Sequence, residues 1–236
     1  MLQQLKALTK ENFPAVVRLW RRFKYHPMVA GSPNKLFSDI YEQNKWGDAE
    51  TRSGAGSSLA QTEEVRKMLP LLIEELGCCS LLDIPCGDFH WMRLVPLEVN
   101  YIGGDIVPEI VDDNQRRYGN ERRQFLHLDL IQDRLPSVDL VLCRDCLVHL
   151  SNSHIIQALT HLKGSGSRYL LTTTFVNLKV NENIPTGYWR PLNLQLPPFN
   201  FPPPLRVVDE KCPRPEYKDK HLGLWQMVDL PDFAAI

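Results

Sequence analysis

Short apolar runs alternate with helical patterns along the middle of this chain, and this alternation constrains the fold more than any other feature. The runs are CSLLDI, VNYIGGD, QFLHLD, VDLVLC and RYLLTTTF. The helical patterns lie at 59–76, in a short stretch from Phe89, at 108–118 and at 153–163. Strands and helices that alternate in this way form a parallel sheet with helices on both faces. We therefore predict an α/β fold.

The end of the chain has a different pattern. LRVVDE and HLGLWQMVDL follow one another without a helical stretch between them, and the second run alternates inward and outward residues. Consecutive strands without a crossover helix pair in the antiparallel sense. We predict an antiparallel hairpin at one edge of the sheet.

The composition indicates a globular protein without a strong charge bias. The 236 residues are 43% hydrophobic and 23% charged, with a formal net charge of −1. This lacks the basic field that nucleic-acid binding needs, so no nucleic-acid partner is expected. No apolar stretch approaches the roughly 20 residues of a membrane span, and MLQQLKALTKENF lacks the apolar core of a secretory signal. We expect a cytoplasmic protein without a membrane span, and the sequence leaves its oligomeric state open.

The six cysteines are expected to be reduced thiols, because most lie in or beside apolar runs. Cys143, Cys146 and His149 have the spacing C-x-x-C-x-x-H, which resembles part of a zinc site. Cys143 closes the run VDLVLC, however, and no second pair of ligands completes a set of four. We predict buried thiols and no metal.

Acidic residues end three successive predicted strands: Asp83, Asp105 and Asp129. In an open parallel sheet, ligands bind beyond the carboxyl ends of the strands, where the strand order reverses. Asp105 follows Asp83 at about 20 residues, the spacing at which a second-strand acid accepts hydrogen bonds from ribose hydroxyls. Asp129 is placed to bind an adenine amino group. Each acid alone has the alternative of capping the next turn, but their joint occurrence favours a nucleoside site.

The turn after the first run, P-C-G-D-F-H, limits the kind of nucleoside. A dinucleotide needs G-x-G-x-x-G so that its pyrophosphate lies on a helix amino end, whereas Pro85 and Phe89 stand where the outer glycines would fall. Gly87 lets the backbone approach a ligand closely. The turn favours a ligand without phosphates.

The order LLDIPCGDFHWM, YIGGDIV, FLHLDL and DLVLCRDCLVHLS resembles the class I S-adenosylmethionine-dependent methyltransferases over about 59–175. The resemblance implies a Rossmann-like seven-stranded sheet and S-adenosylmethionine as cofactor. It places Asp83 and Gly87 at the amino acid moiety of the cofactor, Asp105 at its ribose and Asp129 at its adenine. The chain departs from the commoner D-x-G-x-G-x-G loop. The strand-end residues assigned to the cofactor are Asp83, Pro85, Gly87, Asp105, Ile106, Asp129 and Leu130.

The resemblance also divides the chain. Residues 59–236 form the cofactor-binding domain, with a Pro-rich insertion at 177–205, and residues 1–58 form an N-terminal helix and a lid or acceptor segment. The helix is expected at 12–25, where Pro14 can start it and apolar residues have helical spacing.

The segment CRDCLVHLS follows the fourth strand, which flanks the transferred methyl group in this fold. Asp145 and His149 are four residues apart, so a helical turn would place them on one face. We predict that His149 is a general base oriented by Asp145, with Arg144 near the cofactor and an anionic part of the acceptor. The alternative is that Asp145 caps the turn and His149 is a half-buried structural residue.

Two segments outside the sheet are candidates for the acceptor site. Trp46 lies in YEQNKWGDAETRSGAGSS and is assigned to the sulfonium of the cofactor or to the acceptor, although a mobile surface loop is an equal alternative. Seven of the 18 prolines lie between Pro185 and Pro204, and prolines stiffen a segment that has no regular structure. We call this Pro-rich insertion at 177–205 the strap. Its predicted substrate-binding residues are Tyr188, Trp189 and Arg190.

These observations predict a methyltransferase that acts on a small polar acceptor, with a hydroxyl of a sugar or glycan precursor favoured. Alternatives are an N-methyltransferase acting on an amine or protein, a nicotinamide-dependent oxidoreductase and a non-catalytic cofactor-binding protein. The N-P-P-Y-like motif that holds an amine is replaced here by C-R-D-C.

Overall fold

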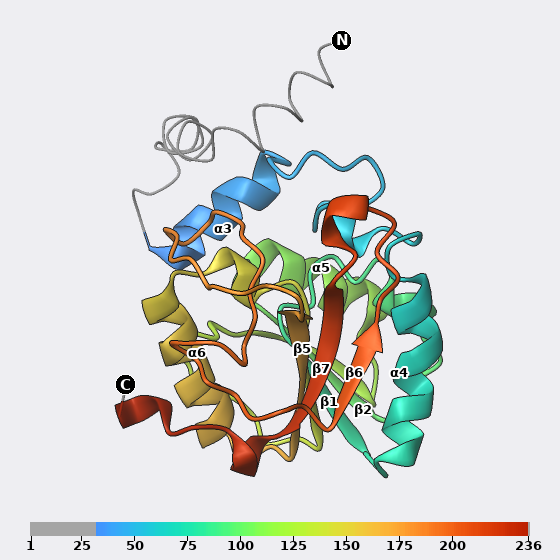
Figure 1. Cartoon of the computed structure of the whole chain (residues 1–236). Helices are drawn as coiled ribbons and strands as arrows, with labels where there is room; N and C mark the ends of the chain where they lie inside the picture. The colour runs from blue at the N-terminus through green and yellow to red at the C-terminus, as the bar shows by residue number, and fades with distance from the viewer. Residues whose placement is uncertain (1–31, 236) are drawn as a thin grey trace.

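The computed structural model describes residues 32–235, which form an α/β fold around one seven-stranded sheet (Figure 1). The strand order is β3-β2-β1-β4-β5-β7-β6. The first five strands are parallel, and β7 is antiparallel to both β5 and β6, which confirms the edge hairpin. The strands are β1 (Ser80–Asp83), β2 (Asn100–Asp105), β3 (Arg123–His127), β4 (Leu140–Cys143), β5 (Tyr169–Phe175), β6 (Arg206–Asp209) and β7 (Lys220–Gln226).

Local signals mark the ends of the helices. Pro108 begins α5, and Arg116 and Arg117 in its last turn interact favourably with the helix dipole. The side chain of Ser151 caps α6 by accepting a hydrogen bond from the backbone N–H of His154. Gly77, with φ +59°, follows the end of α4. The helices are α3 (Pro33–Glu42), α4 (Glu63–Glu75), α5 (Pro108–Tyr118) and α6 (Asn152–Gly164). Single 3₁₀ turns are η2 (Ala55–Ser57), η3 (Met92–Leu94), η4 (Leu147–His149), η5 (Pro215–Tyr217), η6 (Met227–Asp229) and η7 (Phe233–Ala235).

Two apolar cores lie on opposite faces of the sheet. Helices α4 and α5 cover one face, and α6, the Pro-rich strap and the last turns of the chain cover the other. Leu81 and Leu82 are neighbours in β1, belong to different cores and are both fully buried. The central strands β1 and β4 have continuous apolar runs because both of their faces are covered, whereas the edge strand β3 is mostly exposed.

Two local predictions were wrong. The short helix from Phe89 is a turn followed by η3, because Phe89 adopts φ +58° and buries its ring. Strand β7 does not alternate between core and solvent. Nearly all of it is buried, because Leu222 and Leu224 enter one core and Trp225 enters the core on the other face. The helix predicted at 12–25 lies outside the described residues.

Helix α3 and the segment that follows it lie across the end of the sheet where the parallel strands finish (Figure 1). Helix α3 is amphipathic and buries Leu36 and Ile40. The division of the chain at residue 58 stays a prediction, but the described part of the first segment covers the carboxyl ends of the parallel strands.

Candidate active site

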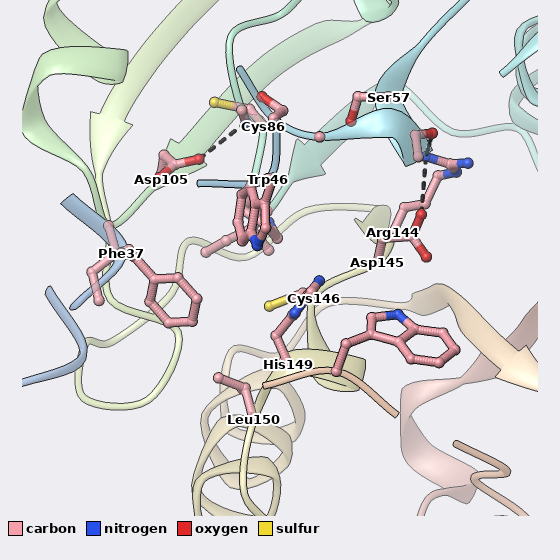
Figure 2. A pocket seen from close by; sticks show the side chains of 18 of the residues that line it. Phe37, Trp46, Ser57, Cys86, Asp105, Arg144, Asp145, Cys146, His149 and Leu150 are labelled. Atoms are coloured by element: carbon pink, nitrogen blue, oxygen red, sulfur yellow. Dashed lines mark hydrogen bonds and ion pairs between the residues drawn. The ribbon is translucent and has the colours of Figure 1, made fainter. Parts of the chain in front are cut away.

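A cavity of about 830 Å³ opens at the carboxyl ends of the parallel strands, between β1 and β4, where the strand order reverses (Figure 2). Its volume lies within the range of small-molecule sites, roughly 300–1,000 Å³. All the predicted site residues except Arg190 line it. These are Trp46, Asp83, Pro85, Gly87, Asp105, Ile106, Asp129, Leu130, Arg144, Asp145, His149, Tyr188 and Trp189.

Asp83 ends β1 with its side chain buried. The hydroxyl of Tyr101 donates a hydrogen bond to Asp83 Oδ2 at 2.7 Å. Burial raises the pKa of Asp83 to about 7, although the Tyr101 hydrogen bond opposes this shift. The charge of this carboxyl therefore changes near neutral pH.

Asp105 ends β2 and connects two turns. Its Oδ2 accepts a hydrogen bond from the N–H of Gly87, and its Oδ1 accepts one from the N–H of Val107, both at 3.0 Å. Burial raises the pKa of Asp105 to about 6 in spite of these donors. An ionised carboxylate offers about four acceptor positions, so it can still accept hydrogen bonds from a ligand hydroxyl.

Asp129, which follows β3, both caps the next turn and faces the cavity. Its Oδ1 accepts from the N–H of Ile131 at 2.8 Å, and its Oδ2 accepts from Gln132 Nε2 at 3.0 Å, so the carboxylate caps the following turn. The same residue lines the cavity beside Leu130.

Residues 46–57, which we call the roof, are tied to the turn after β1. Asp88 accepts hydrogen bonds from Thr51 Oγ1 at 2.7 Å, from the N–H of Arg52 at 3.0 Å and from Ser53 Oγ at 3.1 Å. Gly87 has φ +55°, and a Cβ there would lie 2.3 Å from Ser53 Oγ. Glycine at 87 therefore provides both the left-handed backbone and the room for the roof.

Four charged residues form a buried ion network beside the cavity: Arg144, Asp145, Glu210 and Lys220. Arg144 donates to Glu210 Oε2 through Nη2 at 2.6 Å and through Nε at 3.1 Å. Lys220 Nζ lies 2.6 Å from Asp145 Oδ2 and 3.3 Å from Glu210 Oε2. Two cations and two carboxylates balance, which offsets the desolvation of each charge.

Arg144 also reaches the roof, because its Nη1 donates to the carbonyl of Gly56 at 2.8 Å. Its guanidinium is buried, and its charge is paired with Glu210. Arg144 lines the cavity, but the structure gives no support to the prediction that it binds an anionic part of the acceptor.

Asp145 has φ +53°, an uncommon backbone conformation for a non-glycine residue. Its N–H donates to Thr173 Oγ1 at 2.9 Å, which holds this turn against β5. Burial raises the pKa of Asp145, but the charges of Lys220 and Arg144 outweigh it and lower the pKa to about 2. A fixed negative charge therefore lies at the end of β4.

His149 is oriented by the strap. Its Nδ1 lies 3.0 Å from the carbonyl oxygen of Tyr188, and a carbonyl only accepts, so Nδ1 carries the proton. Nε2 is then the unprotonated nitrogen. Burial lowers the pKa of His149 despite the opposing charge of Asp145, so the ring is neutral at pH 7.

The predicted orienting role of Asp145 was wrong: its carboxylate binds Lys220, and the Tyr188 carbonyl orients the ring instead. The predicted helical turn between the two residues is replaced by the left-handed Asp145 and the 3₁₀ turn η4.

Trp46 and the strap enclose His149. The Trp46 ring lies beside the His149 ring (Figure 2). Their centroids are 5.3 Å apart and their planes are tilted by 36°. Gly187 N–H donates to the His149 carbonyl at 2.8 Å. Arg190 is buried and donates to the carbonyls of Leu147 and Glu182, so it holds the strap against η4 and does not line the cavity. The structure gives no support to a substrate contact by Arg190.

Several site residues were not found from the sequence. Lys220 opens a strand and Glu210 follows another, and neither belongs to a motif. Thr51, Ser53 and Asp88 lie in segments that the sequence analysis names, but only the fold shows that the two hydroxyls donate to the Asp88 carboxylate.

Across residues 32–235, no three His, Cys, Asp or Glu side chains are placed to hold a metal ion. Cys143 is buried in β4, and Cys146 lines the cavity.

The strand order, the antiparallel β7 and the cavity at the reversal point are those of the class I S-adenosylmethionine-dependent methyltransferase fold. The similar solved structures include Burkholderia thailandensis 1,6-didemethyltoxoflavin-N1-methyltransferase, solved with 1,6-didemethyltoxoflavin and S-adenosylhomocysteine bound. It has a TM-score of 0.53 and 16% identity, over 86% of this chain and 89% of that chain.

Two further structures are more distant. Magnesium protoporphyrin IX methyltransferase from Synechocystis PCC 6803, with S-adenosylhomocysteine bound, has a TM-score of 0.46 and 18% identity over 61% of this chain and 72% of that one. The [4+2]-cyclase SpnF has a TM-score of 0.44 and 18% identity over 56% and 54%. No protein-family model and no curated protein matches the sequence. At these identities the likeness shows the fold alone.

Proposed function

We propose that this protein is an S-adenosylmethionine-dependent methyltransferase that methylates a hydroxyl of a small polar acceptor, with a sugar or glycan precursor favoured. The observation that carries the proposal is the position of His149 in the strand-end cavity. Its Nδ1 proton is bound by the Tyr188 carbonyl, and Nε2 has no hydrogen-bond partner among residues 32–235. The class I fold and its cavity support the choice of cofactor.

The lining of the cavity fits the cofactor. Asp105 would hold the ribose hydroxyls, and Asp129 the adenine amino group. Ile106 and Leu130 supply apolar walls for the base. The roof and the turn at Gly87 would enclose the amino acid moiety beside Asp83.

When bound, S-adenosylmethionine supplies a methyl group on a sulfonium centre. The residues of this chain then orient the acceptor and exclude water, because the roof closes over the strand ends. Nε2 of His149 takes the proton of the acceptor hydroxyl. A positioned base of this kind contributes roughly 10²–10⁴ in rate. A neutral amine needs no such base, which is why a hydroxyl acceptor is favoured over N-methylation.

The six cysteines are free thiols, which supports a reducing compartment such as the cytoplasm. Among residues 32–235, no helix combines the length and apolarity needed to cross a bilayer.

Calorimetric titration tests the cofactor. We expect saturable binding of S-adenosylmethionine and S-adenosylhomocysteine by the wild type, strong weakening in Asp105→Ala, and no binding of NADH. A folded wild type that binds neither sulfur compound would remove the proposal.

Labelled methyl transfer to a panel of sugars then tests the base. His149→Ala should lower turnover by roughly 10²–10⁴ while leaving affinity for S-adenosylhomocysteine nearly unchanged. His161→Ala, a change on α6 outside the cavity, is the matched control. Full turnover by His149→Ala would indicate an acceptor that needs no base, such as an amine.

A further inference from the structure

Most of the charges that line the cavity are divided between two regions, with Asp145 the one lining carboxylate of the described residues that lies among the cations. Asp83, Asp105 and Asp129 stand at the end formed by β1, β2 and β3. The cations lie outside this row of acids: just before the roof, after β4, in the loop between β6 and β7, and at the start of β7. They are Lys45, Arg144, Arg214 and Lys220.

Two of these four cations already have carboxylate partners. Arg144 and Lys220 bind Glu210 and Asp145 in the buried ion network. Within residues 32–235, Lys45 and Arg214 form no ion pair. Both are exposed to solvent while lining the cavity, so they stand at its mouth. In the described part of the chain, Lys45 and Arg214 therefore present positive charge at the cavity mouth without a carboxylate partner.

Aromatic side chains line the cavity on and near the 3₁₀ turn that follows Arg214. Arg214 caps η5, and Tyr217 ends that turn. The Tyr217 ring is 4.8 Å from the Trp189 ring, and the Phe175 ring is 5.9 Å from that of Trp189. All three rings line the cavity. A ligand ring placed here would lie against these aromatic side chains, in the same cavity that Arg214 lines.

A guanidinium presents a planar set of donors that matches the two oxygens of a carboxylate or a phosphate. A cation at the mouth of a cleft with apolar walls also raises the local concentration of anions. Both effects favour a negatively charged acceptor over a neutral one.

We propose that the acceptor is a ring compound bearing a carboxylate or phosphate group, which Arg214 binds at the cavity mouth while the ring lies against Trp189 and Tyr217. The assignment rests on the methyltransferase function proposed above. It moves anion recognition from Arg144, where the sequence placed it, to a residue in the loop between β6 and β7.

The test uses the full chain saturated with S-adenosylhomocysteine and three pyranosides that differ in charge: glucose 1-phosphate, glucuronate and methyl glucoside. Binding is measured by ligand-observed NMR and by Trp fluorescence. Arg214→Gln is compared with Arg122→Gln, an exposed arginine at the opposite end of the strands, where β3 begins. Calorimetry with S-adenosylhomocysteine is run on every sample.

We expect at least one of the two anions to bind the wild type at least tenfold more tightly than methyl glucoside. Arg214→Gln should remove about tenfold of that affinity, as expected for a charge-assisted hydrogen bond, and Arg122→Gln should not. Preference for glucose 1-phosphate identifies a phosphate, and preference for glucuronate identifies a carboxylate. Equal binding of all three pyranosides, no binding of either anion, or an Arg214→Gln profile like the wild type would overturn the inference. A folded wild type that does not bind S-adenosylhomocysteine would instead refute the proposed function.

Discussion

The two ends of the cavity are built in different ways. At the cofactor end, three aspartates lie at the carboxyl ends of neighbouring strands. The carboxylates of Asp105 and Asp129 accept hydrogen bonds from the backbone N–H groups of nearby turns. At the acceptor end, the roof, the strap and the loop between β6 and β7 come from distant parts of the chain, and the buried ion network joins the roof to β4 and β7. The cofactor end follows from local chain geometry, whereas the acceptor end depends on long-range contacts.

The largest expected effect is on the acceptor end. Arg144→Met removes the cation that binds Glu210, whose Oε1 already lacks a partner and is buried. Breaking a buried ion pair leaves an uncompensated charge, so the free energy of unfolding should fall by about 3 kcal/mol. Urea unfolding of the purified variant measures this change.

The double variant Arg144→Met/Glu210→Met is the control, because an apolar replacement of both partners is often close to neutral. It should recover most of the lost stability. Equal losses in the single and double variants would contradict the interpretation of this pair as a coupled unit.

The next effect concerns the cofactor end and its pH dependence. The pKa of Asp105 is raised to about 6, so its carboxylate becomes protonated as the pH falls below that value. If the ionised form accepts the ribose hydroxyls, affinity for S-adenosylhomocysteine should fall about tenfold between pH 8 and pH 5, since one unit below a pKa leaves about a tenth of the group ionised.

Calorimetry across this pH range checks the prediction. Asp105→Asn should bind weakly at every pH and lose the dependence. If Asp105→Asn keeps the wild-type profile, the titrating group is another one, with Asp83 the first candidate because its pKa is raised to about 7.

The smallest effect concerns the contact between the two ends. In Gly87→Ala the new Cβ would meet Ser53 Oγ, so the roof must shift. We expect affinity for S-adenosylhomocysteine to weaken roughly fivefold, which corresponds to about 1 kcal/mol of overpacking. Adding Ser53→Gly should restore part of it.

Gly77→Ala is the matched control for backbone strain. Gly77 also has positive φ, +59°, but a Cβ there meets no atom within 4 Å. This variant should lose stability without losing affinity. An equal loss of affinity in Gly77→Ala and Gly87→Ala would show that strain, and not the contact with the roof, is responsible.

Periodicity was enough to predict the seven strands, the antiparallel edge and helices α4, α5 and α6, because apolar cores cover both faces of the central strands and the pattern of apolar runs reflects this. It failed at Phe89, where tertiary burial of one ring outweighed helical spacing. It also failed to pair Asp145 with its true partner, since no sequence spacing relates Asp145 to Lys220.

The sequence by itself determined the sheet and the row of acids at its carboxyl edge, because parallel strands necessarily end together. Only the tertiary structure decided which charges are neutralised and which stay available. Lys220 and Glu210 become site residues through the antiparallel return of β7 beside β5. Likewise, the tautomer of His149 is set by a carbonyl 39 residues away. Hydrogen bonds and ion pairs act over a few ångströms, so their partners are known only once the chain has brought distant segments together.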